Sequence, residues 1–173
     1  MTDEFWDLRD RDDNLTGLTH KRGEPVPEGQ FHIVASVCAV RDDGRMLLTQ
    51  RAAEKSYALG WEIPAGSVLA GESSAQGAVR ELGEETGVFV TPERLQFIGR
   101  IVETSAFFDL YAVRVSGNPT VTPDPNEVND YAWATLADLD ARIAEQSMAR
   151  PWLTRLQTYR EPLVAFLAST TRS

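Results

Sequence analysis

The segment 73–86 places the strongest constraint on how this chain can fold. Ser73, followed three residues later by Gln76, forms the capping box that begins a helix, and Gly87 suits the left-handed position that ends one. Apolar residues between these two signals recur at helical spacing: Ala75, Ala78, Val79 and Leu82. The pattern predicts an amphipathic helix over 73–86 whose apolar face must be covered by another element.

Three glutamates, Glu81, Glu84 and Glu85, share one face of this predicted helix. Their spacing of i, i+3 and i+4 sets them within an arc of roughly 100° on the helix surface. Like charges this close repel, so a bound cation would stabilise the arrangement, and Mg²⁺ prefers carboxylate oxygens. The alternative is a solvated acidic face relieved by Arg80, which can pair with Glu84 one turn later. The spacing alone leaves both interpretations open.

Strand signals precede and follow this helix. Residues 31–40 and 46–49 are apolar and flank Asp43-Gly44, which predicts a β-hairpin. A short strand is expected over 61–63, and a glycine-containing loop over 65–71 connects it to the helix. Further strands are expected over 95–102, over 107–115 and, after an acidic proline-rich loop at 118–130, over 131–134. These segments predict a sheet of at least four strands.

Additional elements lie at both ends of the chain. Residues 5–8 and 15–18 flank an Asp-rich turn, which indicates an N-terminal hairpin. A helix is expected over 135–146, and a last helix begins at Pro151 and is interrupted at Pro162. The order of strands and helices predicts an α+β or layered α/β domain.

The composition excludes several classes of protein. A chain of 173 residues with 42% hydrophobic and 25% charged residues suits one globular domain over 1–173. The net charge of −9 disfavours nucleic acid and anionic membranes as partners. The lone Cys38 cannot form an internal disulfide, and neither a secretory signal nor a membrane-spanning segment is recognisable. We expect a cytoplasmic protein, with a homodimer left open.

The segment Gly66 to Val88 reads GSVLAGESSAQGAVRELGEETGV and is identified as a Nudix box. On these residues the chain resembles the Nudix hydrolase family. The resemblance implies an α+β fold of α/β/α layers, with a mixed sheet sandwiched between helices, framed here by an N-terminal extension (1–30) and a C-terminal helical extension (148–173). It also implies a divalent metal and hydrolysis of a nucleoside diphosphate linked to another group.

The same resemblance implies roles for residues of the box. Glu81 and Glu85 are expected as metal ligands, with Glu84 as a third and the carbonyl oxygen of Gly66 as a fourth. The expected ion is Mg²⁺, with Mn²⁺ as a substitute. Arg80, counted among the catalytic residues, would orient the carboxylates around the ion.

Two further roles fall partly outside the box. The general base that activates water is either Glu84 or Glu127 in the acidic loop, and the sequence leaves this open. Arg51, Tyr57 and Trp61, just upstream of the box, are the candidate contacts to a small nucleotide-type substrate, because aromatic rings can stack on a base. The particular diphosphate substrate and the number of metal ions are not specified.

A second resemblance concerns the N-terminal region. His20 and His32, together with the N-terminal hairpin, are similar to the isopentenyl diphosphate isomerase branch of the same superfamily. That branch has Cys and His where this chain has Ala65 and Ser67, so isomerase chemistry lacks its agents. A non-catalytic nucleotide-binding domain on the same fold is the other alternative, and the roles of both histidines stay open.

Overall fold

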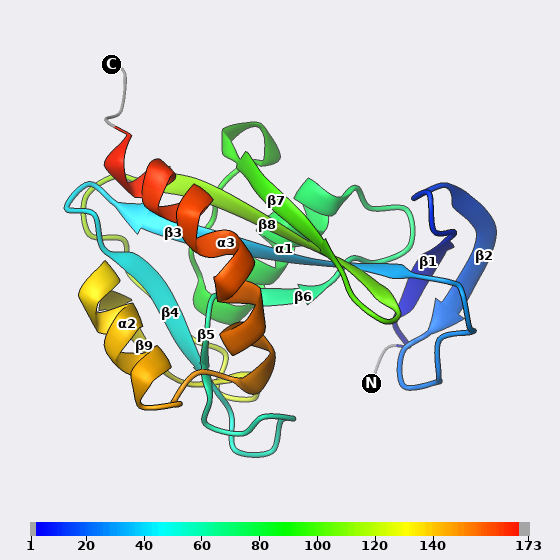
Figure 1. Cartoon of the computed structure of the whole chain (residues 1–173), viewed down its shortest axis with the longest axis horizontal. Helices are drawn as coiled ribbons and strands as arrows, with labels where there is room; N and C mark the ends of the chain where they lie inside the picture. Colours follow the sequence, from blue (N-terminus) through cyan, green and yellow to red (C-terminus); the bar gives the residue numbers. More distant parts are fainter. Residues whose placement is uncertain (1–2, 170–173) are drawn as a thin grey trace.

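A mixed β-sheet lies between helices packed on its two faces (Figure 1). The computed structural model describes residues 3–169, so the outermost residues of both predicted extensions, 1–2 and 170–173, lie outside the described residues. Along the sheet run β5 (Trp61–Glu62), β4 (Met46–Arg51), β3 (His32–Arg41), β8 (Ala106–Val115) and β7 (Gln96–Val102). Two further strands join it: β6 (Ala65–Ser67) beside β3, and β9 (Val128–Ala134) beside β4. Because β3 and β8 pair in parallel and the others antiparallel, the predicted mixed sheet is confirmed.

Alternation along β3 divides the core into two layers. Val37 packs in the layer formed with α1 (Ser74–Thr86), whereas its neighbour Cys38 packs in the layer formed with α3 (Arg150–Ala168). The helix α2 (Leu136–Ala144) joins the α3 layer. Both β3 side chains are fully buried. The predicted α/β/α layering is therefore confirmed.

The helix α1 has the two ends that its sequence predicts. The Ser73 hydroxyl accepts a hydrogen bond from the Gln76 backbone N–H, and the Gln76 side chain accepts one from the Ser73 N–H. Gly87 adopts φ 70° and donates its N–H to the carbonyl of Gly83. A Cβ atom at Gly87 would also lie 3.2 Å from Thr122. The capped ends fix the helix that carries the three glutamates.

The predicted hairpin and the predicted loop after it both need correction. The chain turns at Asp43-Gly44 as expected, but β3 and β4 share a single residue pair, Val40 with Met46. Beyond that pair, β4 turns away to pair with β9 and β5. Residues 65–67, predicted as a loop, form β6 and take the free edge of β3. The alternation of apolar and polar residues along one segment cannot predict pairing between strands that are distant in the sequence.

The helix α3 continues through Pro162, contrary to the predicted interruption. Proline removes one backbone N–H and crowds the preceding turn, which usually ends a helix. Here Tyr159 and Leu163 are buried on both sides of it, and the Tyr159 hydroxyl donates to the Phe108 carbonyl at 2.6 Å. Packing on the sheet therefore holds both halves together. Within residues 3–169, the helices are all too short or too polar to cross a membrane.

The strands β1 (Phe5–Arg9) and β2 (Leu15–Lys21) form the predicted N-terminal hairpin at one end of the molecule (Figure 1). Trp6 stacks on His32, with 4.0 Å between ring centroids and 11° between ring planes. His20 is also buried, and its Nε2 atom contacts a backbone carbonyl oxygen at 2.9 Å. Both histidines thus lie where the hairpin docks on the sheet.

This docking contact predicts a loss of stability in mild acid. Burial, with a smaller contribution from His20, lowers the pKa of His32 from 6.5 to about 4, although Glu103 opposes the shift. Between these two values the unfolded chain binds a proton that the folded chain does not, so stability is lost as pH falls from 6.5 towards 4. We expect a loss of about 2 kcal/mol at pH 5 from this group.

Urea unfolding of the parent protein and of His32→Gln at pH 7.5 and pH 5 measures this effect. The parent should lose more free energy of unfolding between the two pH values than the variant does. Equal losses in the two proteins would show that folding does not lower the pKa of His32.

Candidate active site

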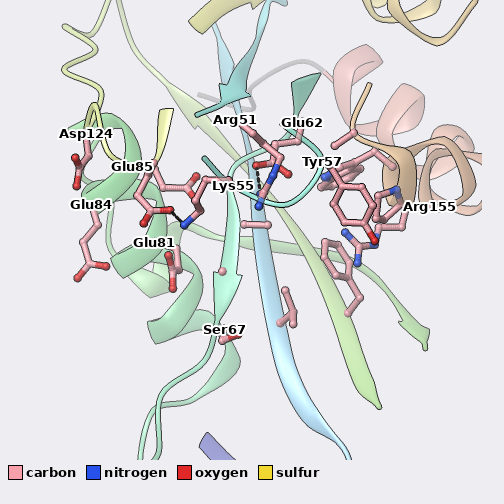
Figure 2. A pocket seen from close by; sticks show the side chains of 18 of the residues that line it. Arg51, Lys55, Tyr57, Glu62, Ser67, Glu81, Glu84, Glu85, Asp124 and Arg155 are labelled. Carbon is pink, nitrogen blue, oxygen red and sulfur yellow. Dashed lines mark hydrogen bonds and ion pairs between the residues drawn. The ribbon is translucent and has the colours of Figure 1, made fainter. Parts of the chain in front are cut away.

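A cavity of about 410 Å³ brings together side chains from separate parts of the chain. Figure 2 shows the glutamates of α1 on one side, Tyr57 and Arg155 on the other, and Arg51 with Glu62 between them. Seven of the predicted site residues line it: Arg51, Tyr57, Gly66, Glu81, Glu84, Glu85 and Glu127. The cavity therefore sets negative charge opposite positive charge, an arrangement suited to a cation and an anionic ligand together.

Glu85 is the most deeply buried carboxylate in the wall. Its side chain is only 7% exposed, and its Oε2 atom has no hydrogen-bond partner among residues 3–169. Burial raises the pKa of Glu85 well above the ordinary value, and repulsion from Glu62, Glu81 and Glu127 raises it further. A carboxylate held in this way is stabilised by any cation that reaches its free oxygen.

Gly66 and Glu81 lie in close contact at the next position along the wall. A Cβ atom added to Gly66 would lie 2.2 Å from both carboxylate oxygens of Glu81, so any larger residue would displace that side chain. Burial also raises the pKa of Glu81, and Arg80 only partly offsets the shift. The absence of a side chain at Gly66 therefore allows the backbone of β6 and the Glu81 carboxylate to face the same small volume.

Arg80 holds the acidic residues of the box in place. Its guanidinium donates to both oxygens of Glu72 at 2.8 and 3.0 Å, to the Ser67 carbonyl at 2.9 Å and to Glu81 at 2.9 Å. A further bond reaches Glu84 at 3.0 Å. The side chain lies behind the carboxylates and does not line the cavity. Arg80 therefore contacts the acidic side chains from the side away from the cavity.

The carboxylates match a hard divalent cation in charge and in donor type. The unpartnered Oε2 of Glu85 and the approach of the Glu81 carboxylate to the Gly66 backbone both favour such an ion. Within the described part of the chain, no three acidic, His or Cys side chains converge as a complete ligand group. Arg80 pairs with Glu81, and Lys55 pairs with Glu127, so a cation would compete with these ion pairs for the same oxygens.

Both candidate bases line the cavity, in different settings. The Glu84 side chain is 61% exposed and pairs only with Arg80 among residues 3–169. Glu127 is anchored through its backbone, because its carbonyl accepts from the Ala52 N–H at 3.0 Å. The neighbouring Asp124 donates its N–H to the Glu85 carbonyl, which ties the acidic loop to the end of α1.

Glu62 is a cavity residue that the box does not predict. It is 7% exposed, and Arg51 donates to its carboxylate at 2.8 Å. Burial raises the pKa of Glu62, although Arg51 opposes the shift. The signal in the sequence is an acidic residue between Trp61 and Ile63 in a strand that is otherwise apolar.

Trp61, predicted to contact substrate, lies outside the cavity. Neighbouring residues of a strand point to opposite sides, so Trp61 faces away from the cavity that Glu62 lines. Its ring packs under Arg142 of α2 at 4.5 Å. The C-terminal helix instead supplies Arg155, which lies 3.7 Å over the Phe108 ring. Arg155 lies about a hundred residues from the upstream contacts, so only the fold brings it to the site.

Comparison of the sequence with known proteins finds one family model and several relatives. The family model described as NUDIX domain matches residues 30–156. A Nudix hydrolase of Listeria monocytogenes is 40% identical over 89 residues, covering 50% of this chain and 53% of that protein. A Nudix hydrolase of Streptomyces coelicolor is 29% identical over 91% of each chain, and an isopentenyl-diphosphate isomerase of Streptomyces avermitilis is 29% identical over 89% of this chain and 82% of that protein. The chain thus spans about half the length of the Listeria relatives.

Solved structures share the fold. A protein of Deinococcus radiodurans superposes with a TM-score of 0.70 at 23% identity, covering 84% of this chain and 92% of that one. A NUDIX hydrolase of Nitrosomonas europaea superposes with a TM-score of 0.60 at 20% identity, covering 76% and 88%. Because the family model covers the sheet, the glutamates of α1 and most of the cavity lining, the chain belongs to the Nudix family.

Proposed function

We propose that this chain is a metal-dependent hydrolase that cleaves the diphosphate linkage of a nucleoside diphosphate joined to another group. Water would attack at phosphorus. The observation that carries the proposal is the Glu85 carboxylate, which is buried in the cavity wall with an unpartnered oxygen among residues 3–169. A divalent ion would offset this electrostatic cost and give the cavity its reactive centre.

Glu81, Glu84 and Glu85 would hold the ion, together with the carbonyl oxygen of Gly66. When bound, Mg²⁺ neutralises diphosphate oxygens and lowers the pKa of a bound water, and Mn²⁺ can substitute. A structural neighbour from Francisella tularensis, a bifunctional NMN adenylyltransferase/ADP ribose pyrophosphatase, was solved with AMP and a Mn ion, so both ions merit testing here. Arg80, which donates to Glu81 and Glu84, would keep these carboxylates oriented towards the ion.

The opposite wall would hold the substrate. Arg51 faces the cavity beside Glu62 and offers positive charge to a phosphate group. Tyr57, 53% exposed at the same cavity, offers an aromatic face to a base. The general base would be Glu84 or Glu127, and either can abstract the proton of a water held between the two walls.

Isomerisation is the second candidate, because isopentenyl-diphosphate isomerases are among the relatives. That reaction needs groups that add and remove a proton at carbon. Ala65 and Ser67 line the cavity where the isomerase branch carries Cys and His. The single cysteine, Cys38, is fully buried in the sheet, and burial raises its pKa to about 12. These observations favour hydrolysis.

Activity should depend on a divalent cation and on Glu85. A panel of nucleoside diphosphate sugars, dinucleotides and nucleoside triphosphates, assayed with Mg²⁺ for released phosphate products, identifies the best substrate. Excess chelator should abolish turnover, and Glu85→Gln should lower kcat by at least 10²-fold, because the amide keeps the volume and loses the charge.

The matched control is Glu145→Gln, an identical substitution at an exposed position outside the cavity. It should leave kcat within twofold. Full turnover in chelator, or a Glu85→Gln enzyme within threefold of the parent, would refute the metal site.

The dependence of kcat on Mg²⁺ concentration and on pH, measured for Glu84→Gln and Glu127→Gln, distinguishes the two candidate bases. Glu84 lies beside the expected ligands, so Glu84→Gln should weaken metal binding, and high Mg²⁺ should recover part of the lost rate. If Glu127 is the base, Glu127→Gln should lower kcat by 10²-fold or more, keep the Mg²⁺ requirement and remove the acidic limb of the pH profile. A Glu127→Gln enzyme with parental kcat from pH 6 to 9 would exclude the acidic loop.

A further inference from the structure

The N-terminal hairpin contributes a charged pair to the cavity. Glu4 and Arg22 both line it, and both lie outside the segment 30–156 that matches the family model. The Arg22 guanidinium donates to the Glu4 carboxylate at 2.6 Å, and its backbone N–H donates to the Glu4 carbonyl at 2.9 Å. The hairpin is therefore placed to act on whatever enters the cavity.

The hairpin is fastened to the elements that build the site. The Ala70 N–H donates to the Phe5 carbonyl at 2.8 Å, and the Gly71 N–H donates to the Asp7 carboxylate at 2.8 Å. Ala70 and Gly71 belong to the segment that leads from β6 into α1. These bonds therefore hold the hairpin, and with it the backbone of Arg22, against the start of the helix that carries the glutamates.

Four cationic residues line the cavity, and the side chain of Arg22 is the most exposed of the four. Arg155 makes two bonds to Glu103, at 2.7 and 2.9 Å, and also stacks on Phe108. Arg51 bonds to Glu62 and to the Ser56 carbonyl, and Lys55 pairs with Glu127. The side chains of Arg22 and Glu4 are 55% and 39% exposed, and exposed pairs of this kind contribute little to stability. Exchange of Glu4 for another anion would therefore cost little.

The charge of Arg22 also faces the acidic wall. Its pKa is raised mainly by the hydrogen bond to Glu4, and Glu127 and Glu81 raise it further through space, although burial opposes the shift. Phosphate oxygens that approach these carboxylates with a cation would thus come within the field of Arg22. A guanidinium can bind two oxygens of one phosphate at once.

We propose that Arg22 is a substrate-binding residue, whose guanidinium leaves Glu4 and takes up a phosphate group of the diphosphate substrate. Glu4 occupies the guanidinium until the substrate arrives. The inference rests on the proposed function, since it concerns the same cavity. It assigns to the N-terminal hairpin a part of the affinity that the matched segment 30–156 does not supply.

Binding of methylenediphosphonate, a diphosphate analogue that cannot be hydrolysed, tests this directly. Calorimetry in Mg²⁺ buffer should give a Kd at least tenfold weaker for Arg22→Ala than for the parent, with partial recovery in Arg22→Lys, which keeps the charge and loses the paired donors. Glu4→Gln should bind as tightly as the parent or up to fivefold more tightly, because the competing carboxylate is gone.

Lys21→Ala is the matched control. This neighbouring residue pairs with Asp3 at 2.9 Å and does not line the cavity, so its loss should change the Kd less than twofold. Equal affinity of Arg22→Ala and the parent, or an equal loss in Lys21→Ala, would overturn the inference. So would a parent protein that does not bind the analogue.

The result separates the inference from the proposed function. Binding that depends on Arg22, in a protein without turnover on the substrate panel, would support the inference and refute the hydrolase. Turnover by the parent, with an Arg22→Ala variant that keeps the parental Kd and KM, would support the hydrolase and refute the inference.

Discussion

Folding this chain buries the Glu85 carboxylate beside Glu62, Glu81 and Glu127, and repulsion among these charges opposes that burial. Several features hold the arrangement in spite of this cost. The capping box and Gly87 fix both ends of α1, and Arg80 ties the neighbouring acids to the loop before the helix. The fold thus maintains a concentration of negative charge around Glu85 that Arg51 offsets only in part and that a bound cation would neutralise.

Local signals predicted the part of the site that lies on one helix. The bounds of α1, its caps and the shared face of Glu81, Glu84 and Glu85 follow from residues within one 23-residue segment. The order of the predicted strands and helices indicates the α+β class, and the resemblance of that segment to the Nudix family implies the mixed sheet. Where a feature depends on neighbours a few residues apart, the sequence carries enough information to locate it.

Features that depend on distant pairing were not predictable in this way. β3 and β4 separate after one residue pair because β6 pairs with β3 and β9 pairs with β4. The continuation of α3 through Pro162 depends on its packing against the sheet. The basic side of the cavity is assembled from the hairpin, the loop after β4 and α3, so Arg22, Lys55 and Arg155 have no common motif. Trp61 lies close to the box in the sequence, yet its ring packs under Arg142 and does not line the cavity.

Thermal unfolding with and without Mg²⁺, compared between the parent and Glu85→Gln, tests whether Glu85 binds the metal ion. We expect Mg²⁺ at ten times its Kd to raise the parent Tm by about 3 °C or more, because the ion binds only the folded state. Glu85→Gln without metal should be at least as stable as the parent at neutral pH, since the variant lacks the buried charge. Mg²⁺ should no longer raise its Tm. An unchanged parent Tm, or an equal rise in both proteins, would contradict a metal site at Glu85.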